Sequence, residues 1–125
     1  MTKQVNKMGF GSLRVNKVSD DMAEVFLYGD IGSWGDGLSA DDFARELKSL
    51  KVTDITARIN SGGGSVFEGQ AIYNSLVNHP AKVNVVIDGI AASIASVIAM
   101  AGDNISITEG SHIMVHKPWS MAMGD

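Results

Sequence analysis

The sequence predicts a single α/β domain with a mostly parallel sheet and flanking helices. In the second half of the chain, β-type runs alternate with helix-like runs, which is typical of parallel sheets covered by helices. Glycine-containing stretches begin directly after two of the strand-like runs, at residues 60–65 and at residue 89. In such sheets ligands bind at the carboxyl ends of strands. The length of 125 residues allows one domain, which we expect to cover residues 1–125.

The first half of the chain predicts two paired strands, a helix and a third strand. Residues 8–15 and 23–28 are rich in β-type side chains, and the turn-forming residues between them indicate a hairpin-like pair. Ser39 and the two acidic residues of 41–42 are typical of a helix start. Apolar side chains recur at positions i, i+4 and i+7 from Phe43, so this helix should run to about residue 51. A strand over residues 52–59 follows.

The second half predicts two more helices and three short strands. Ser65 and Glu68 have the spacing of a capping box, in which each side chain bonds the other residue's backbone. The expected elements are a helix from Ser65 to about residue 79, a strand at residues 82–87, a helix at residues 89–102, and strands at residues 104–108 and 113–116.

Composition excludes several classes of protein. The net charge of −4 and the scattered basic residues argue against nucleic-acid binding. The absence of cysteine excludes thiol catalysis, disulfides and cysteine-bound zinc. The apolar run at residues 90–101 is too short to cross a bilayer and no secretory signal is recognisable, so we expect a cytoplasmic protein without membrane contact. Nothing in the sequence indicates a cofactor or a metal.

Two residue patterns indicate chemistry. Ser93 lies at an expected helix start, where free backbone N–H groups can stabilise an oxyanion, although a serine there can equally be a simple helix cap. His116 ends a strand-like run and can act as a base, but it can also be an ordinary strand-end histidine. The three glycines of 62–64 require a tight turn or a close backbone approach. They do not form a phosphate-binding loop, because no Gly-Lys-Ser/Thr follows.

Three motifs in this order resemble the proteolytic subunit of the Clp protease. They are residues 60–66 (Asn-Ser-Gly-Gly-Gly-Ser-Val) with Ala-Ile-Tyr at 71–73, residues 89–93 (Gly-Ile-Ala-Ala-Ser), and residues 114–118 (Met-Val-His-Lys-Pro). The resemblance extends from about residue 23 onward and is strongest to the Clp-related head-maturation proteases of phages and prophages. It implies a serine peptidase of the Clp/crotonase-like fold that assembles into rings enclosing the active sites.

Carried over position by position, the resemblance implies a role for each motif residue. Ser93 is the nucleophile, His116 is the general base, and the backbone N–H groups of Gly64 and Ile94 form the oxyanion hole. The implied substrate-binding loop consists of Gly62, Gly63 and Ser65. The expected partners are a peptide or protein substrate and other copies of the chain in a ring. The sequence does not indicate whether an ATPase partner exists.

The chain departs from the family pattern in three respects, one of which is a connection between Ser93 and His116 that looks slightly shorter than usual. Gly62 stands where the family usually has proline. The interlocking helix and the triad aspartate that follow the His-Pro motif in the family are not in the sequence, so we expect a chain that is incomplete at its C-terminus. Loss of the orienting carboxylate costs about 10⁴ in turnover, so we expect this 125-residue form to be nearly inactive.

Three alternatives remain open. A crotonase-like hydratase or isomerase would use the oxyanion hole without a serine nucleophile. A Ser/Lys peptidase would use Lys117, although adjacent strand residues point to opposite faces and only one of Lys117 and His116 can serve Ser93. A truncated, non-catalytic assembly protein would keep the fold alone.

Overall fold

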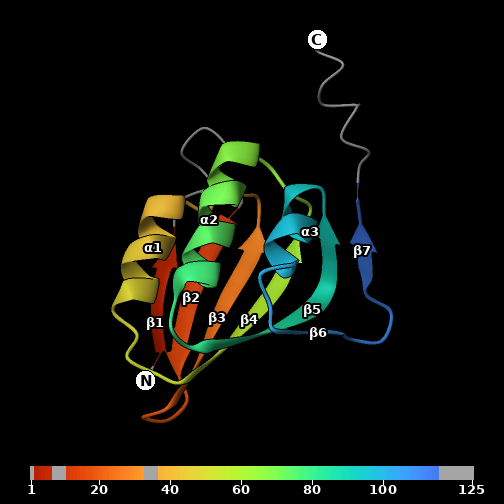
Figure 1. The fold of residues 1–125 in the computed structure, drawn as a ribbon. Coiled ribbons are helices and arrows are strands. Elements are labelled where there is room, and N and C mark those ends of the chain that lie inside the picture. The colour runs from red at the N-terminus through yellow and green to blue at the C-terminus, as the bar shows by residue number, and fades with distance from the viewer. Residues whose placement is uncertain (1, 7–10, 33–36, 116–125) are drawn as a thin grey trace.

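The computed structural model describes residues 2–6, 11–32 and 37–115, which form a seven-stranded sheet with helices packed on one face (Figure 1). The strand order is β1-β2-β3-β4-β5-β6, and β7 pairs with the far end of β5. The strands are β1 (Thr2–Asn6), β2 (Gly11–Lys17), β3 (Met22–Gly29), β4 (Asp54–Ser61), β5 (Lys82–Ala92), β6 (Asn104–Ile107) and β7 (His112–Met114). The helices are α1 (Ala40–Lys48), α2 (Val66–Asn78) and α3 (Ile94–Ala99).

Strand direction divides the sheet into two parts. The pairs β1–β2 and β2–β3 are antiparallel, whereas β3–β4, β4–β5, β5–β6 and β5–β7 are parallel. The predicted class, α/β with a mostly parallel sheet and flanking helices, is therefore confirmed. The predicted hairpin-like pair corresponds to β2 and β3. The sequence does not predict β1, because Thr2–Asn6 contains one apolar residue and shows no alternation.

The core lies between the sheet and the helices. Side chains of β4 alternate between buried and partly exposed positions, and Ile55, Ala57 and Ile59 are buried against the helical layer. Phe43 of α1 and Ile72 of α2 are at most 1% exposed. Full burial of an apolar side chain of this kind contributes about 1.5–3 kcal/mol. The core therefore holds the helices to one face of the sheet and leaves the other face open.

Serine side chains begin α1 and α2, as the sequence predicts. Ser39 Oγ accepts a hydrogen bond from Asp42 N–H (3.3 Å), and Ser65 Oγ accepts one from Glu68 N–H (3.3 Å). The reciprocal half of the predicted capping box is wrong, because Glu68 Oε1 accepts instead from the N–H of Ala40 (2.9 Å). The Glu68 carboxylate therefore ties the start of α2 to the start of α1.

The prediction of one helix over residues 89–102 is wrong. β5 continues to Ala92, and α3 covers only Ile94–Ala99. The end of β5 stays extended because it pairs with β7, a contact between distant parts of the sequence that local propensity does not reveal. The neighbour that approaches this segment closely is α2, where a Cβ on Gly69 would lie 2.3 Å from Cγ1 of Ile94. No helix in the described part of the chain has the length and apolarity needed to span a membrane.

The open face of the sheet carries a polar cluster across β3, β4 and β5. Arg58 Nη1 donates to Asp88 Oδ1 (2.7 Å), and Arg58 Nε donates to Glu24 Oε2 (3.2 Å). The hydroxyl of Tyr28 donates to the other oxygen of Asp88, Oδ2, at 2.8 Å. Burial raises the pKa of Tyr28, and the hydrogen bond and negative charge of Asp88 raise it further. The folded protein therefore holds the Tyr28 proton more tightly than the unfolded chain does.

Alkaline pH is expected to weaken the fold through Tyr28. Because its pKa is raised above 10.0 in the folded state, its contribution to stability is complete below pH 10 and is lost as the pH rises through the raised value. Tyr28→Phe has no proton to lose at this position. Between about pH 9 and about pH 12, its free energy of unfolding in urea should fall less steeply than that of the wild type. Parallel pH profiles for the two proteins would contradict this coupling.

Candidate active site

Ser93 lies at the junction between β5 and α3. Its backbone has φ 57° and ψ −128°, the one positive φ at a non-glycine position among the described residues. A conformation of this kind costs on the order of 1–3 kcal/mol and persists only where the surroundings enforce it. Three hydrogen bonds hold this junction. Ser93 N–H donates to Met114 C=O (3.0 Å), and Ser93 C=O accepts from both the N–H (2.9 Å) and the hydroxyl (2.5 Å) of Ser96. The Ser93 side chain makes no capping bond, so the reading of Ser93 as a simple helix cap is not supported.

The glycine loop after β4 packs directly against Ser93. A Cβ built on Gly63 would lie 2.9 Å from Ser93 Cβ and 3.5 Å from Ser93 Oγ. Gly63 also has a positive φ of 107°. The sequence expectation of a close backbone approach at the glycines is therefore confirmed at this position. The open position is Gly62, where a Cβ would have no atom within 4 Å.

Gly64 joins the loop to the segment after β3. Ile31 N–H donates to Gly63 C=O (3.0 Å), and Ser65 N–H donates to Ile31 C=O (2.8 Å), which makes a parallel bridge between Ile31 and Gly64. In such a bridge Ile31 bonds to the residues on either side of Gly64, and the N–H of Gly64 itself points away from Ile31. The N–H of Gly64 is therefore not used by Ile31. The N–H of Ile94, at the first position of α3, has no acceptor within the helix.

The predicted base lies outside the described residues. His116 and Lys117 both belong to this part of the chain, so their roles stay predictions. The strand before them is described. β7 runs parallel to the end of β5, with His112 opposite Ile90 and Met114 opposite Ala92. The chain two residues before His116 is thus hydrogen-bonded to the backbone of Ser93 through Met114.

Two residues at the end of β4, to which the sequence analysis assigned no role, hold the two parts of the site. One contacts the glycine loop and the other contacts the end of β5. Ser61 is 2% exposed, and its Oγ accepts from Gly63 N–H (3.1 Å). Asn60 Oδ1 accepts from Ile90 N–H (3.2 Å), three residues before Ser93. The only signal in the sequence is that both polar side chains come directly before the glycines.

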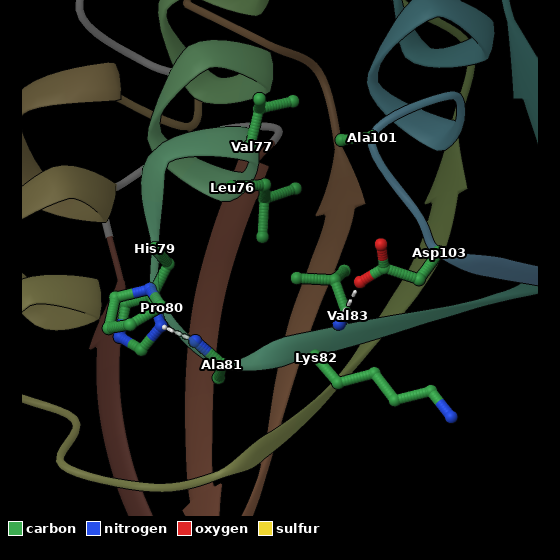
Figure 2. A pocket seen from close by; sticks show the side chains of 9 residues that line it. All are labelled: Leu76, Val77, His79, Pro80, Ala81, Lys82, Val83, Ala101 and Asp103. Atoms are coloured by element: carbon green, nitrogen blue, oxygen red, sulfur yellow. Dashed lines mark hydrogen bonds between the residues drawn. The ribbon is translucent and has the colours of Figure 1, made fainter.

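Two clefts in the described structure do not include Ser93 in their lining. One, of about 580 Å³, is formed by the end of α2, the start of β5 and the loop before β6 (Figure 2). There the Asp103 carboxylate accepts from Val83 N–H (2.8 Å). A second cleft, of about 800 Å³, lies between the ends of α1 and α2 and includes Leu47 and Pro80. Ser93 follows the end of β5, whereas the first cleft includes Lys82 and Val83 at the start of that strand.

Solved structures define the class of protein. The chain is 31% identical to ClpP1 from Listeria monocytogenes, with a TM-score of 0.67 over 76% of this chain and 56% of that one. It also matches a putative enoyl-CoA hydratase from Streptomyces coelicolor A3(2) with a TM-score of 0.60 and 20% identity, over 81% of this chain and 46% of that one. The second match shows the fold alone. The fold is therefore the mixed α/β sheet with flanking helices that Clp proteolytic subunits and crotonase-like enzymes share.

Sequence comparison identifies the family. The Clp protease family model matches residues 15–125. An ATP-dependent Clp protease proteolytic subunit of Bacteroides fragilis is 40% identical over 100 residues, 75% of this chain and 48% of that protein. The same subunit of Ligilactobacillus salivarius is 44% identical over 73 residues, 57% of this chain and 37% of that protein. The chain belongs to the Clp protease family, and it spans less than half the length of these relatives.

Proposed function

We propose that the protein is a serine endopeptidase in which Ser93 is the nucleophile and His116 is the general base. The observation that carries the proposal is the strained backbone of Ser93, held at a strand-to-helix junction against the glycine loop. Strain of this kind is concentrated at functional sites. The bond from Ser93 N–H to Met114 C=O supports the assignment of His116, because it ties Ser93 to the strand that leads to this histidine.

In the proposed reaction, His116 removes the proton from Ser93 Oγ while Oγ bonds to the carbonyl carbon of the scissile peptide. The carbonyl oxygen becomes an oxyanion, which the N–H groups of Gly64 and Ile94 stabilise by hydrogen bonds. His116 then gives its proton to the departing amine as the C–N bond breaks, and water hydrolyses the resulting ester. One oxyanion donor contributes about 10²–10³ to turnover in such enzymes.

The substrate class is a peptide or protein. Clp family membership supports peptide-bond hydrolysis. The resemblance to phage and prophage head-maturation proteases supports a capsid protein as the natural substrate. A crotonase-like reaction is the second candidate, since it would use the same two N–H groups on an acyl thioester. The strained backbone of Ser93 favours the peptidase, because a thioester enolate needs no serine nucleophile.

A fluorophosphonate probe tests this proposal, because it reacts with an activated serine and does not require complete turnover. We expect one probe per chain, on the peptide that contains Ser93 when the labelled protein is digested and analysed by mass spectrometry. Boiled protein is the control for non-specific attachment. If the protein is not labelled but binds an acyl thioester, the crotonase-like reaction is supported instead. If it is neither labelled nor binds an acyl thioester, the non-catalytic alternative is supported.

We also propose that the protein assembles into a ring of identical copies, as the family resemblance implies. Supporting this, the outer strands expose apolar side chains, including Ile107 (50%) on β6 and Met114 (53%) on β7. Sedimentation velocity should show an oligomer that Ile107→Lys weakens. Val18 is similarly exposed (56%) at the turn between β2 and β3, so Val18→Lys is a matched control. A wild-type monomer at high concentration would contradict the ring.

A further inference from the structure

The pairing between β4 and β5 changes register just before Ser93. From Asp54 opposite Lys82 to Ile59 opposite Ile87 the register is constant, but the next pair is Ser61 opposite Ala91. Between these pairs lie one residue of β4, Asn60, and the three residues 88–90 of β5. β5 therefore carries two more residues than β4 at this bulge. Such irregularities bend a strand and redirect the residues that follow it.

The hydrophobic pattern alone does not specify this register. Side chains of a strand alternate with a period of two, so a slip by two residues keeps every side chain on its own face. If β5 continued in its first register, the end of the strand would be displaced along β4 by two residues, about 6.6 Å. Ser93 would move with it, away from the glycine loop. A specific interaction is therefore needed to hold the bulge.

The side-chain amide of Asn60 supplies this interaction. Asn60 Oδ1 accepts from Ile90 N–H at 3.2 Å, in place of a bond that the interrupted ladder cannot make. The amide lies so close to the bulge that a Cβ on Gly89 would come within 2.5 Å of Oδ1. On the same open face of the sheet, Arg58 and Tyr28 hold Asp88, the first residue of the bulge. Side chains of β3 and β4 thus hold the bulge at both ends.

The residue that Asn60 holds is also the first that pairs with β7. Ile90 lies opposite His112, and the pairing continues through Ala92 opposite Met114. Fixing Ile90 therefore sets the position of β7 as well as that of Ser93. The next residue of β4, Ser61, holds the glycine loop through Gly63 N–H. The end of β4 therefore contacts both the glycine loop and the part of β5 that leads to Ser93.

We propose that Asn60 is a positioning residue for the nucleophile, whose side-chain acceptor sets the β5 bulge and through it the place of Ser93. The proposal rests on the proposed peptidase function. A misplacement of about 1 Å can cost about a hundredfold in rate. We therefore expect Asn60→Ala to reduce the rate of fluorophosphonate labelling by roughly tenfold to a hundredfold under conditions where the protein is fully folded.

Rescue by a conservative variant separates positioning from general structural damage. Asn60→Asp keeps an acceptor of the same size at the same place, so its labelling rate should return to within about threefold of wild type. Asn84→Ala is the matched control. The side-chain oxygen of Asn84 accepts a hydrogen bond from the side-chain amide of Asn104 (3.0 Å), on the same sheet but away from the bulge. Asn84→Ala should label at the wild-type rate. Equal losses in Asn60→Ala and Asn60→Asp, or no loss in Asn60→Ala, would overturn the proposal.

A second readout does not depend on the peptidase assignment. Amide hydrogen exchange measured by NMR should show Ile90 N–H protected in the wild type and in Asn60→Asp, and exchanging faster in Asn60→Ala. Absence of labelling in the wild type would refute the proposed function and leave this structural result intact. Unchanged protection of Ile90 in Asn60→Ala would refute the positioning role, whatever the labelling shows.

Discussion

Replacing Ser93 by alanine is expected to abolish fluorophosphonate labelling and peptide cleavage while leaving the free energy of unfolding nearly unchanged. The hydroxyl oxygen is the proposed reacting atom, and removing the nucleophile of a serine hydrolase with a complete triad lowers turnover by roughly 10⁶-fold. The Ser93 side chain makes no capping bond, so the loss of its hydroxyl removes no capping hydrogen bond from the start of α3. Alanine also keeps a Cβ at the strained φ of 57°, so the variant tests the oxygen alone.

Companion variants show which neighbour serves Ser93. Ser106→Ala removes a hydroxyl from an exposed position on β6 and should leave labelling unchanged. His116→Ala should lose nearly as much activity as Ser93→Ala, and the double variant should lose little more, because the two residues act as a unit. Lys117→Ala should remain active. Loss of activity in Lys117→Ala, with activity retained in His116→Ala, would support a Ser/Lys peptidase. Labelling that persists in Ser93→Ala would show that another residue is the nucleophile.

The order of strands and helices could be predicted from the sequence because local patterns determine it. Ser39 and Ser65 cap α1 and α2, and the buried positions of α1 include Phe43 and Leu47, as their spacing indicates. The end of β5 could not be predicted in this way. Its alanines favour a helix locally, but pairing with β7 keeps them extended. Local preference therefore failed where a partner distant in the sequence decides the conformation.

The candidate site was predictable in part. The glycines indicate a close approach, and the structure has one between Gly63 and Ser93. The positive φ of Ser93 leaves no trace in the sequence, because serine adopts it only under tertiary constraint. The bulge opposite Asn60 could not be predicted from the sequence either. A register shift of two residues preserves the alternation of side chains, so the sequence pattern is the same with and without it.

Alanine at Gly64 is expected to disrupt the site and destabilise the protein, whereas alanine at Gly62 is expected to leave the fold intact. A Cβ on Gly64 would lie 2.2 Å from the carbonyl oxygen of Ile31, a backbone atom that cannot rotate away, and the φ of Gly64 is 149°. The bridge to Ile31 would have to open. We expect Gly64→Ala to lose about 2–4 kcal/mol of unfolding free energy. Displacing the proposed oxyanion donor should lower labelling and cleavage by about 10²-fold or more.

Gly62→Ala is the matched control, two residues away in the same loop. No atom lies within 4 Å of its added Cβ, and Gly62 is not among the glycines with a positive φ. Alanine there reduces the freedom of the unfolded chain and should stabilise the protein by about 0.4–1 kcal/mol. Urea unfolding and labelling rates measured on both variants decide the matter. If Gly64→Ala keeps the stability and labelling rate of the wild type, as Gly62→Ala should keep its fold, the Ile31–Gly64 bridge does not hold the loop. If the two variants lose stability and labelling equally, the loss comes from any substitution in the loop and not from the bridge.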